Sequence, residues 1–166
     1  MADAILTAER LRELLHYDPE TGVFTWQKKR NCRVKLGGVA GSIYNNGYRV
    51  IGVDRKYRLA HRLAWLYVHG EMPAGEIDHI NGDRTDNRIA NLRDVSKSVN
   101  NQNKKHAMSN NTSGLLGACW DSYNHQWKAQ IGLNGKQYKI GVFDSAESAH
   151  AAYLAAKRKL HEGCTI

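Results

Sequence analysis

Two Asn-Gly pairs, each set between strand-like segments, constrain the fold of this chain more than any other feature. Asn46-Gly47 separates residues 41–44 from 48–53, and Asn134-Gly135 separates 127–133 from 136–143. Asn-Gly between such segments is a strong signal for a two-residue β-hairpin turn. The sequence therefore predicts an antiparallel hairpin in each half of the chain.

Helical segments lie between and after the predicted strands. The leucines near the N-terminus fall on one face of a short helix capped by Thr7; they are Leu6, Leu11, Leu14 and Leu15. Residues 59–70, LAHRLAWLYVHG, predict a second helix that ends at Gly70. Ser145 caps an Ala-rich third helix, whose basic cluster at 157–159 suits a helix end.

Composition and pattern divide the chain into four segments. Residues 1–58 form a β-rich region, and residues 59–104 contain the second helix and a polar stretch. Residues 105–112 have linker composition, and residues 113–166 contain three predicted strands followed by the third helix. The expected fold class is α+β, with a β-rich N-terminal segment, a central ββα unit and a C-terminal three-stranded antiparallel sheet plus one helix.

The charge of the chain indicates a polyanionic partner. The net charge is +8 in only 166 residues, which suits a nucleic acid or a membrane surface. No apolar run approaches the roughly 18 residues that span a bilayer. The N-terminal sequence MADAILTAERLRELL is interpreted as neither a secretory nor a transit peptide.

The chain has three cysteines, which are Cys32, Cys119 and Cys164, and they form no CxxC pair. We therefore expect neither a disulfide framework nor a zinc knuckle, and a reducing cytoplasm fits.

The polar stretch at residues 76–104 is poor core material and is a candidate site. Residues 92–95 can pair back on the strand that carries Asp78 and His79, and Ser96 can cap a helix that carries Asn100. A hairpin followed by a helix would bring Asp78, His79 and Asn100 together.

These residue types suit hydrolysis of a phosphodiester. Carboxylate and amide oxygens are ligands that Mg²⁺ prefers. A neutral histidine beside the metal can take a proton from an attacking water, which is worth about 10²–10⁴-fold in rate. An Asp-His pair is also common as a capped turn or a structural hydrogen bond. A calcium loop is disfavoured because Ile80 stands where an oxygen ligand is needed, and zinc is disfavoured because no soft ligand accompanies His79.

The order Asp78-His79, Asn91-Leu92-Arg93, Asn100 and Asn103 resembles the HNH endonucleases, in particular the phage and intron-encoded homing branch. The resemblance covers residues 59–104. It implies that Asp78 and Asn100 are metal ligands, that His79 is the general base, and that Asn91 ties the hairpin loop and orients the base. It also implies Mg²⁺ or Mn²⁺ as cofactor, with no structural zinc. His61, in the preceding helix, is interpreted as a packed structural residue.

Residues 113–163 resemble the DNA-binding domain of the APETALA and ethylene-response type. The supporting residues include Gly117, Trp120, 127–131 and 141–147. The predicted first strand lacks the arginines of the plant domains, so a grip mostly on phosphates is expected. The candidate DNA contacts in this region are Trp120, Trp127, Lys128, Gln130, Lys136, Tyr138 and Lys139. Those in the N-terminal region are Lys28, Lys29, Arg30, Arg55, Lys56 and Arg58.

The function expected from these patterns is a metal-dependent, phage-borne DNA endonuclease that nicks one strand per active site. Its partner would be double-stranded DNA rather than a membrane, it would act as a monomer or weak homodimer, and it would work in the cytoplasm of a bacterial host. The alternatives are a non-catalytic DNA-binding regulator that keeps the fold, a structural protein that packages DNA, and a nuclease that acts on RNA.

Overall fold

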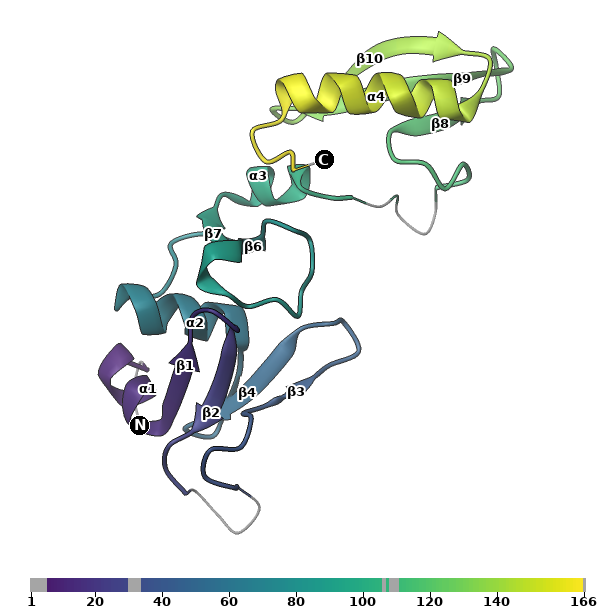
Figure 1. Cartoon of the computed structure of the whole chain (residues 1–166). Coiled ribbons are helices and arrows are strands. Elements are labelled where there is room, and N and C mark those ends of the chain that lie inside the picture. The colour runs from purple at the N-terminus through teal and green to yellow at the C-terminus, as the bar shows by residue number, and fades with distance from the viewer. Residues whose placement is uncertain (1–5, 30–33, 106, 108–110, 166) are drawn as a thin grey trace. The chain divides into compact units, whose positions relative to one another are not determined.

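The computed structural model describes residues 6–29, 34–105, 107 and 111–165. The chain forms two compact units, Met1–Val95 and Ser96–Ile166, which are described separately below (Figure 1). Within the described ranges, no helix combines the length and apolar character that crossing a membrane requires. Of the residues singled out above, Arg30 and Cys32 lie outside the described ranges.

The first unit contains two helices and three small antiparallel sheets. Its elements are α1 (Ala8–Leu14), β1 (Leu15–Asp18), β2 (Val23–Trp26), β3 (Ser42–Ile43), β4 (Arg49–Val53), β5 (Lys56–Leu59), α2 (Ala60–His69), β6 (Glu76–His79), the 3₁₀ turn η1 (Ile89–Asn91) and β7 (Leu92–Val95). The sheets are β1-β2, β3-β4-β5 and β6-β7. The mixed α+β class is confirmed.

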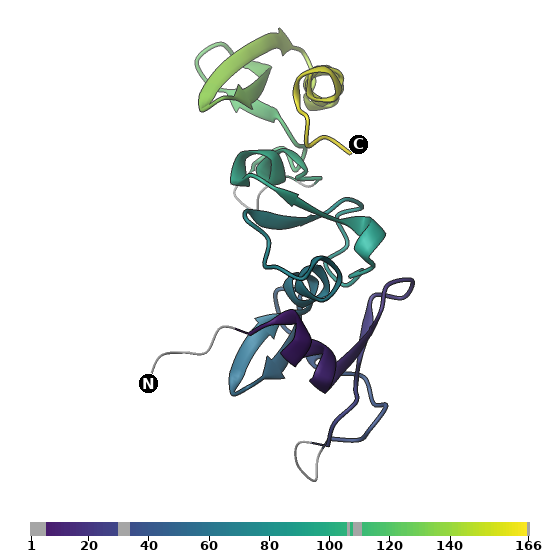
Figure 2. The same cartoon turned by 90° about the vertical axis from the view of Figure 1, so that its left-hand side faces the viewer.

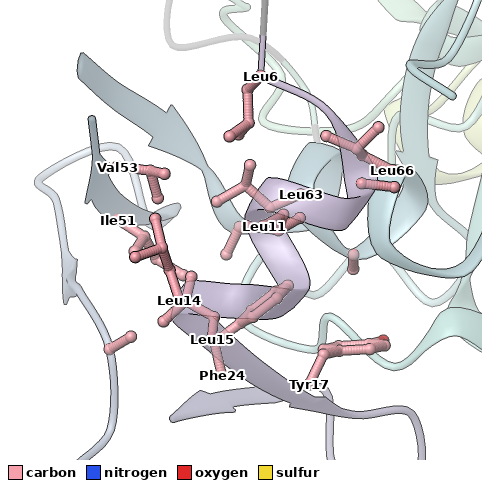
Figure 3. Packing of buried hydrophobic residues seen from close by; sticks show 14 of the residues in the cluster. Leu6, Leu11, Leu14, Leu15, Tyr17, Phe24, Ile51, Val53, Leu63 and Leu66 are labelled. Carbon is pink, nitrogen blue, oxygen red and sulfur yellow. The ribbon is translucent and has the colours of Figure 1, made fainter. Parts of the chain in front are cut away.

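The core of the first unit is built from α1, α2 and the two N-terminal sheets. Leu11, Leu14 and Leu15 gather with Phe24 and Ile51, and all five are almost fully buried (Figure 3). Burying large aliphatic and aromatic side chains contributes roughly 1.5–3 kcal/mol each, which makes this cluster the main support of the unit.

Both helices of this core begin or end where the sequence indicates. Thr7 is the N-cap of α1, and its hydroxyl accepts a hydrogen bond from the backbone N–H of Arg10 at 3.2 Å. Gly70 ends α2 in the left-handed conformation, with φ 83°. The first predicted hairpin is confirmed as β3 and β4, joined through a turn in which the N–H of Gly47 donates to the carbonyl of Tyr44.

The second unit contains a short helix, a three-stranded sheet and a long helix. Its elements are α3 (Lys97–Gln102), β8 (Ala118–Asp121), β9 (Gln126–Leu133), β10 (Lys136–Phe143) and α4 (Ala146–Leu160). The sheet is antiparallel, in the order β10-β9-β8. Figure 2 looks along α4, which lies against one face of this sheet and buries Ala149 and Tyr153 against Ala118, Ala129 and Ile131. The predicted C-terminal sheet plus helix is confirmed.

Two local predictions in the first unit were wrong. Leucine spacing placed Leu15 on the N-terminal helix, but Leu15 is extended (φ −133°, ψ 141°) and pairs with Trp26 in the first strand. Leu59 was expected to begin the second helix, but it is the last residue of β5, which pairs with β4, and the helix begins at Ala60. Asp54 and Arg55, both at positive φ, make the tight turn between these strands.

Candidate active site

The hairpin of β6 and β7 carries the two residues expected to do the chemistry. Ile77 and Leu92 are buried in the core of the first unit and anchor the hairpin. Asp78 and His79 are buried as well, at 6 % and 4 % exposure, although both are polar. Because buried polar groups need partners, the contacts of these two side chains define the site.

Two carboxylates of this hairpin have defined partners. Asp78 lies opposite Arg93 in the strand ladder, and its Oδ2 accepts from Nε and Nη2 of that arginine at 2.9 and 2.8 Å. Asp94 accepts from the backbone N–H groups of Ala74 and Gly75, both at 2.8 Å, and so holds the entry to β6. The hairpin therefore keeps the buried carboxylate of Asp78 in place through the guanidinium of Arg93.

The imidazole of His79 is held by an amide. Its Nε2 lies 3.2 Å from Oδ1 of Asn87. Burial lowers the pKa of His79, while the hydrogen bond to Asn87 and the charges of Asp78, Asp83 and Asp86 act in the opposite direction. The net lowering of the pKa favours the neutral imidazole near pH 7, which is the form that can accept a proton.

Aromatic rings from two other elements surround His79. The ring of His61, on α2, lies 5.1 Å from that of His79 between centroids, and Tyr48 lies 5.1 Å from His61 and 6.0 Å from His79. Burial, together with the neighbouring His79, lowers the pKa of His61 to about 3.

The guanidinium of Arg84 lies over the Tyr48 ring, and its Nη1 donates to the carbonyl of Asn46 at 2.8 Å. This bond ties the β3–β4 turn to the loop after β6.

Asn91 closes the loop between β6 and β7. Its Nδ2 donates to Oδ1 of Asn81 at 3.0 Å and to the carbonyl of Asp86 at 2.9 Å. Its Oδ1 accepts from the backbone N–H of Asn81 at 3.0 Å. These bonds join the two ends of the loop that carries Asn87. The side chain of Asn91 thus bonds to this loop, whereas Asn87 contacts the histidine ring directly.

Asn100 comes from the second unit. It lies on α3, whose N-cap Ser96 accepts a hydrogen bond from the backbone N–H of Val99 at 3.3 Å, as the sequence indicates. Asn103 is the C-cap of this helix and is buried. The role of Asn100 as a partner of Asp78 stays a prediction.

The donor types available for a metal ion are oxygens. Asp78 supplies a carboxylate and Asn100 an amide carbonyl, and hard divalent cations such as Mg²⁺ prefer these groups. In the parts of the chain that the structure describes, no group of three or more His, Cys, Asp or Glu side chains is arranged as a metal site. A carboxylate such as that of Asp78 suits a cation that keeps other coordination positions for water and substrate.

Two residues of the site, Asn87 and Tyr48, were not predicted. Asn87 lies in the loop of the same hairpin and Tyr48 lies directly before β4, and no local spacing marks either residue as a neighbour of His79. The pairing of Asp78 with Arg93 was not predicted either, although opposite charges on two strands expected to pair are a signal for such a contact.

Comparison with known proteins identifies the family of this chain. A profile of the HNH endonuclease family matches residues 58–102. The chain is also similar to "Protein 3.8" of Escherichia phage T7, with 33 % identity over 102 residues that cover 61 % of this chain and 83 % of the relative. This chain belongs to the HNH endonuclease family. No solved structure gives a significant match to it.

In this HNH chain the N-terminal candidates for DNA contact lie mostly at the surface. Lys28 and Lys29 follow β2 and are exposed, and the Nζ of Lys28 lies 3.5 Å from a carboxylate oxygen of Glu13. Arg55 is exposed in the β4–β5 turn. Lys56 and Arg58 lie on β5.

The C-terminal candidates divide between the two faces of the sheet. Ala129 and Ile131 face α4, so their neighbours Lys128 and Gln130 face away from it, together with Lys139, which pairs with Gln130. The same register places the other four candidates on the α4 side; they are Trp120, Trp127, Lys136 and Tyr138. The open face of the HNH chain's C-terminal sheet therefore combines cationic and amide side chains.

Proposed function

We propose that this chain is a metal-dependent DNA endonuclease of the phage homing type, which hydrolyses phosphodiester bonds and nicks one strand per active site. The observation that carries the proposal is the buried pair Asp78 and His79 at the end of β6, inside the segment that matches the HNH profile. A carboxylate directly beside a neutral imidazole, both held in place by hydrogen bonds, is an arrangement typical of functional sites.

Asp78 and Asn100 would hold Mg²⁺ or Mn²⁺, in keeping with their oxygen donors. When bound, such a cation would neutralise charge on the phosphate and on the leaving oxygen in the transition state. No structural zinc is expected, because the proposed ligand set contains no thiolate.

His79 is the proposed general base. Its lowered pKa keeps the ring neutral near pH 7, so that it can take one proton from the attacking water. The water oxygen forms the new bond to phosphorus, the bond from phosphorus to the leaving oxygen breaks, and the leaving oxygen takes a proton from solvent. Asn91 supports this step by closing the loop that carries Asn87.

The C-terminal sheet is proposed to bind duplex DNA in the manner of the APETALA and ethylene-response type. Support comes from Lys128, Gln130 and Lys139, which share the sheet face that α4 leaves open. The exposed N-terminal residues Lys28, Lys29 and Arg55 would grip the phosphate backbone as well. With one proposed base and one proposed cation site, a monomer or weak homodimer in a bacterial host would nick rather than cut both strands.

A plasmid-relaxation assay tests the proposal. Supercoiled DNA that carries the sequence around the gene's own locus is incubated with the protein at low salt, in Mg²⁺, Mn²⁺ or EDTA. We expect open-circular product only with metal. We also expect His79→Ala to lose at least about 10²-fold in rate while it still retards DNA on a gel. His16→Ala, at an exposed histidine of β1, is the matched control.

Each outcome separates the proposal from its rivals. If His79→Ala nicks at the wild-type rate, the assignment of the base is wrong. Linear product would indicate that two active sites act together. Retardation without any nicking, on a random fragment library as well as on the native locus, would favour the non-catalytic DNA-binding regulator.

A further inference from the structure

Asn87 is a buried amide in a loop that is otherwise mostly exposed. Its side chain is 1 % exposed, whereas Thr85 and Arg88 beside it are exposed. Both ends of the amide have partners: Oδ1 lies 3.2 Å from Nε2 of His79, and Nδ2 donates to the carbonyl of Thr85 at 3.3 Å. A polar side chain buried this deeply, and satisfied at both ends, acts as a rigid link.

The direction of this amide determines where the proton of His79 lies. If the amide were flipped, Oδ1 would face the carbonyl of Thr85, and two acceptors cannot bond to each other. The Nδ2 group therefore belongs at Thr85 and the Oδ1 atom at His79. An oxygen acceptor needs a donor, so Nε2 of the neutral ring carries the hydrogen and Nδ1 keeps the basic lone pair.

The β1–β2 hairpin holds the backbone of Asn87 from behind. The hydroxyl of Tyr17 donates to the carbonyl of Asn87 at 2.7 Å, in a buried contact. Burial raises the pKa of Tyr17 to about 12, so the hydroxyl stays protonated and remains a donor. Gly22, in the turn of the hairpin, is so close that a Cβ there would lie 2.5 Å from both the carbonyl carbon of Asn87 and the backbone nitrogen of Arg88.

We propose that Asn87 is a positioning residue that holds the ring of His79 with its proton on Nε2, so that Nδ1 is the nitrogen that takes the proton from water. The proposal rests on the proposed function, because the choice of nitrogen matters for catalysis only if His79 is the base. It also gives the N-terminal hairpin a role, since Tyr17 and Gly22 fix the segment from which Asn87 reaches the ring.

The test combines a spectrum with kinetics on the full-length protein. Nitrogen-15 spectra of the histidine rings at about pH 8, where imidazole is neutral, report which nitrogen carries the proton and how fast that proton exchanges with water. The His79 signals are assigned by their absence from His79→Gln. For the wild type we expect a slowly exchanging proton on Nε2.

Substitution of Asn87 separates positioning from simple packing. Asn87→Leu keeps a similar volume without an acceptor, and we expect fast exchange of the ring proton and a kcat for nicking lower by roughly 10–100-fold, with KM for DNA unchanged. Asn87→Asp keeps the acceptor oxygen, so we expect the slow exchange to return. Asn124→Leu, at an exposed amide of the second unit, should behave as wild type.

Three results would overturn the proposal: a wild-type proton on Nδ1, or a wild-type Nε2 proton that exchanges fast, or an Asn87→Leu variant with slow exchange and normal kcat. If Asn87→Leu does not fold, Tyr17→Phe replaces it, because this change removes only the hydroxyl that holds Asn87. Faster exchange of the His79 ring proton in Tyr17→Phe supports the proposal, and unchanged exchange overturns it. If the wild type nicks no DNA, the proposed function fails, while the spectrum still decides whether Asn87 holds the ring.

Discussion

Two imidazoles share the interior of the site. The rings of His61 and His79 lie nearly perpendicular, at 83°, with centroids 5.1 Å apart. Burial lowers the pKa of both groups, and that of His61 falls to about 3. A proton on His61 would place a charge in an apolar environment next to a second ring, so the folded chain keeps His61 neutral.

This arrangement predicts that acid destabilises the fold. The pKa of His61 is about 6.5 in the unfolded chain and about 3 in the folded one. Above about pH 6.5 the group is neutral in both states and does not affect stability. Below that pH the unfolded chain binds a proton that the folded chain excludes. The free energy of unfolding should therefore fall by up to about 1.4 kcal/mol per pH unit from this residue.

Urea unfolding at a series of pH values measures the effect. His61→Phe keeps a ring without a titrating group and should show a shallower loss of stability between about pH 6 and 4, whereas the exposed His16→Phe should follow the wild type. An unchanged slope in His61→Phe would contradict a neutral, buried His61.

The order of residue types in the sequence was enough to single out Asp78 and His79, and the predicted hairpin that carries them is present. It was not enough to find Asn87. That residue lies in a polar loop whose composition indicates exposure, yet it is buried, and Tyr17 and Gly22 of a distant hairpin lie against its backbone. Contacts of this kind depend on tertiary packing, which local patterns do not encode.

At the scale of secondary-structure elements, the turn between β1 and β2 approaches the loop that carries Asn87 more closely than any side chain would allow. Gly22 has φ +71°, and a Cβ would overlap the backbone of Asn87 and Arg88. Gly37 has nearly the same φ, +73°, but nothing lies within 4 Å of its Cβ position. The two glycines therefore form a matched pair: their backbone conformation is nearly the same, but only Gly22 has no room for a Cβ atom.

We expect Gly22→Ala to lose at least about 2 kcal/mol of stability and to slow nicking. The added methyl group would push the β1–β2 turn and the backbone of Asn87 apart, which would shift Asn87. Gly37→Ala should lose only about 1 kcal/mol, from its positive φ alone. Chemical denaturation and the relaxation assay measure both effects. Equal losses in the two variants would show that the close approach of the turn to Asn87 is unimportant.

The elements most easily predicted were those with strong local signals. Thr7, Ser96 and Ser145 mark helix starts, and the glycine after Asn134 marks a hairpin. The strands β1 and β5 were missed for a common reason, which is that no loop separates them from a helix. β1 directly follows α1, and β5 directly precedes α2. The run of leucines then continued the helical spacing through Leu15, although backbone pairing with Trp26 determines its conformation.

At the scale of the whole molecule, the excess of positive charge predicts DNA binding that weakens steeply with salt. If Lys128 and Lys139 contact phosphates from the open face of the sheet, the double change Lys128→Ala and Lys139→Ala should lower the slope of log affinity against log salt by about 2. Lys159→Ala, on the helix that covers the opposite face, should leave the slope unchanged. Fluorescence anisotropy at several salt concentrations measures the slope, and equal slopes in both variants would argue against this face.

Within the second unit, hydrogen bonds join α3 and the two residues after it to α4 and the C-terminal tail. The N–H of Gly163 donates to Oε1 of Gln102 at 3.0 Å, Thr165 donates to Oδ1 of Asn103, and the buried Lys157 donates to the carbonyl of Lys104. These bonds have a consequence for recombination between related genes. An exchange of modules at the linker would separate α3, which carries Asn100, from the tail that holds it. A crossover ahead of residue 96 would keep α3 and the tail together, but it would take Asn100 from a different parent than Asp78 and His79.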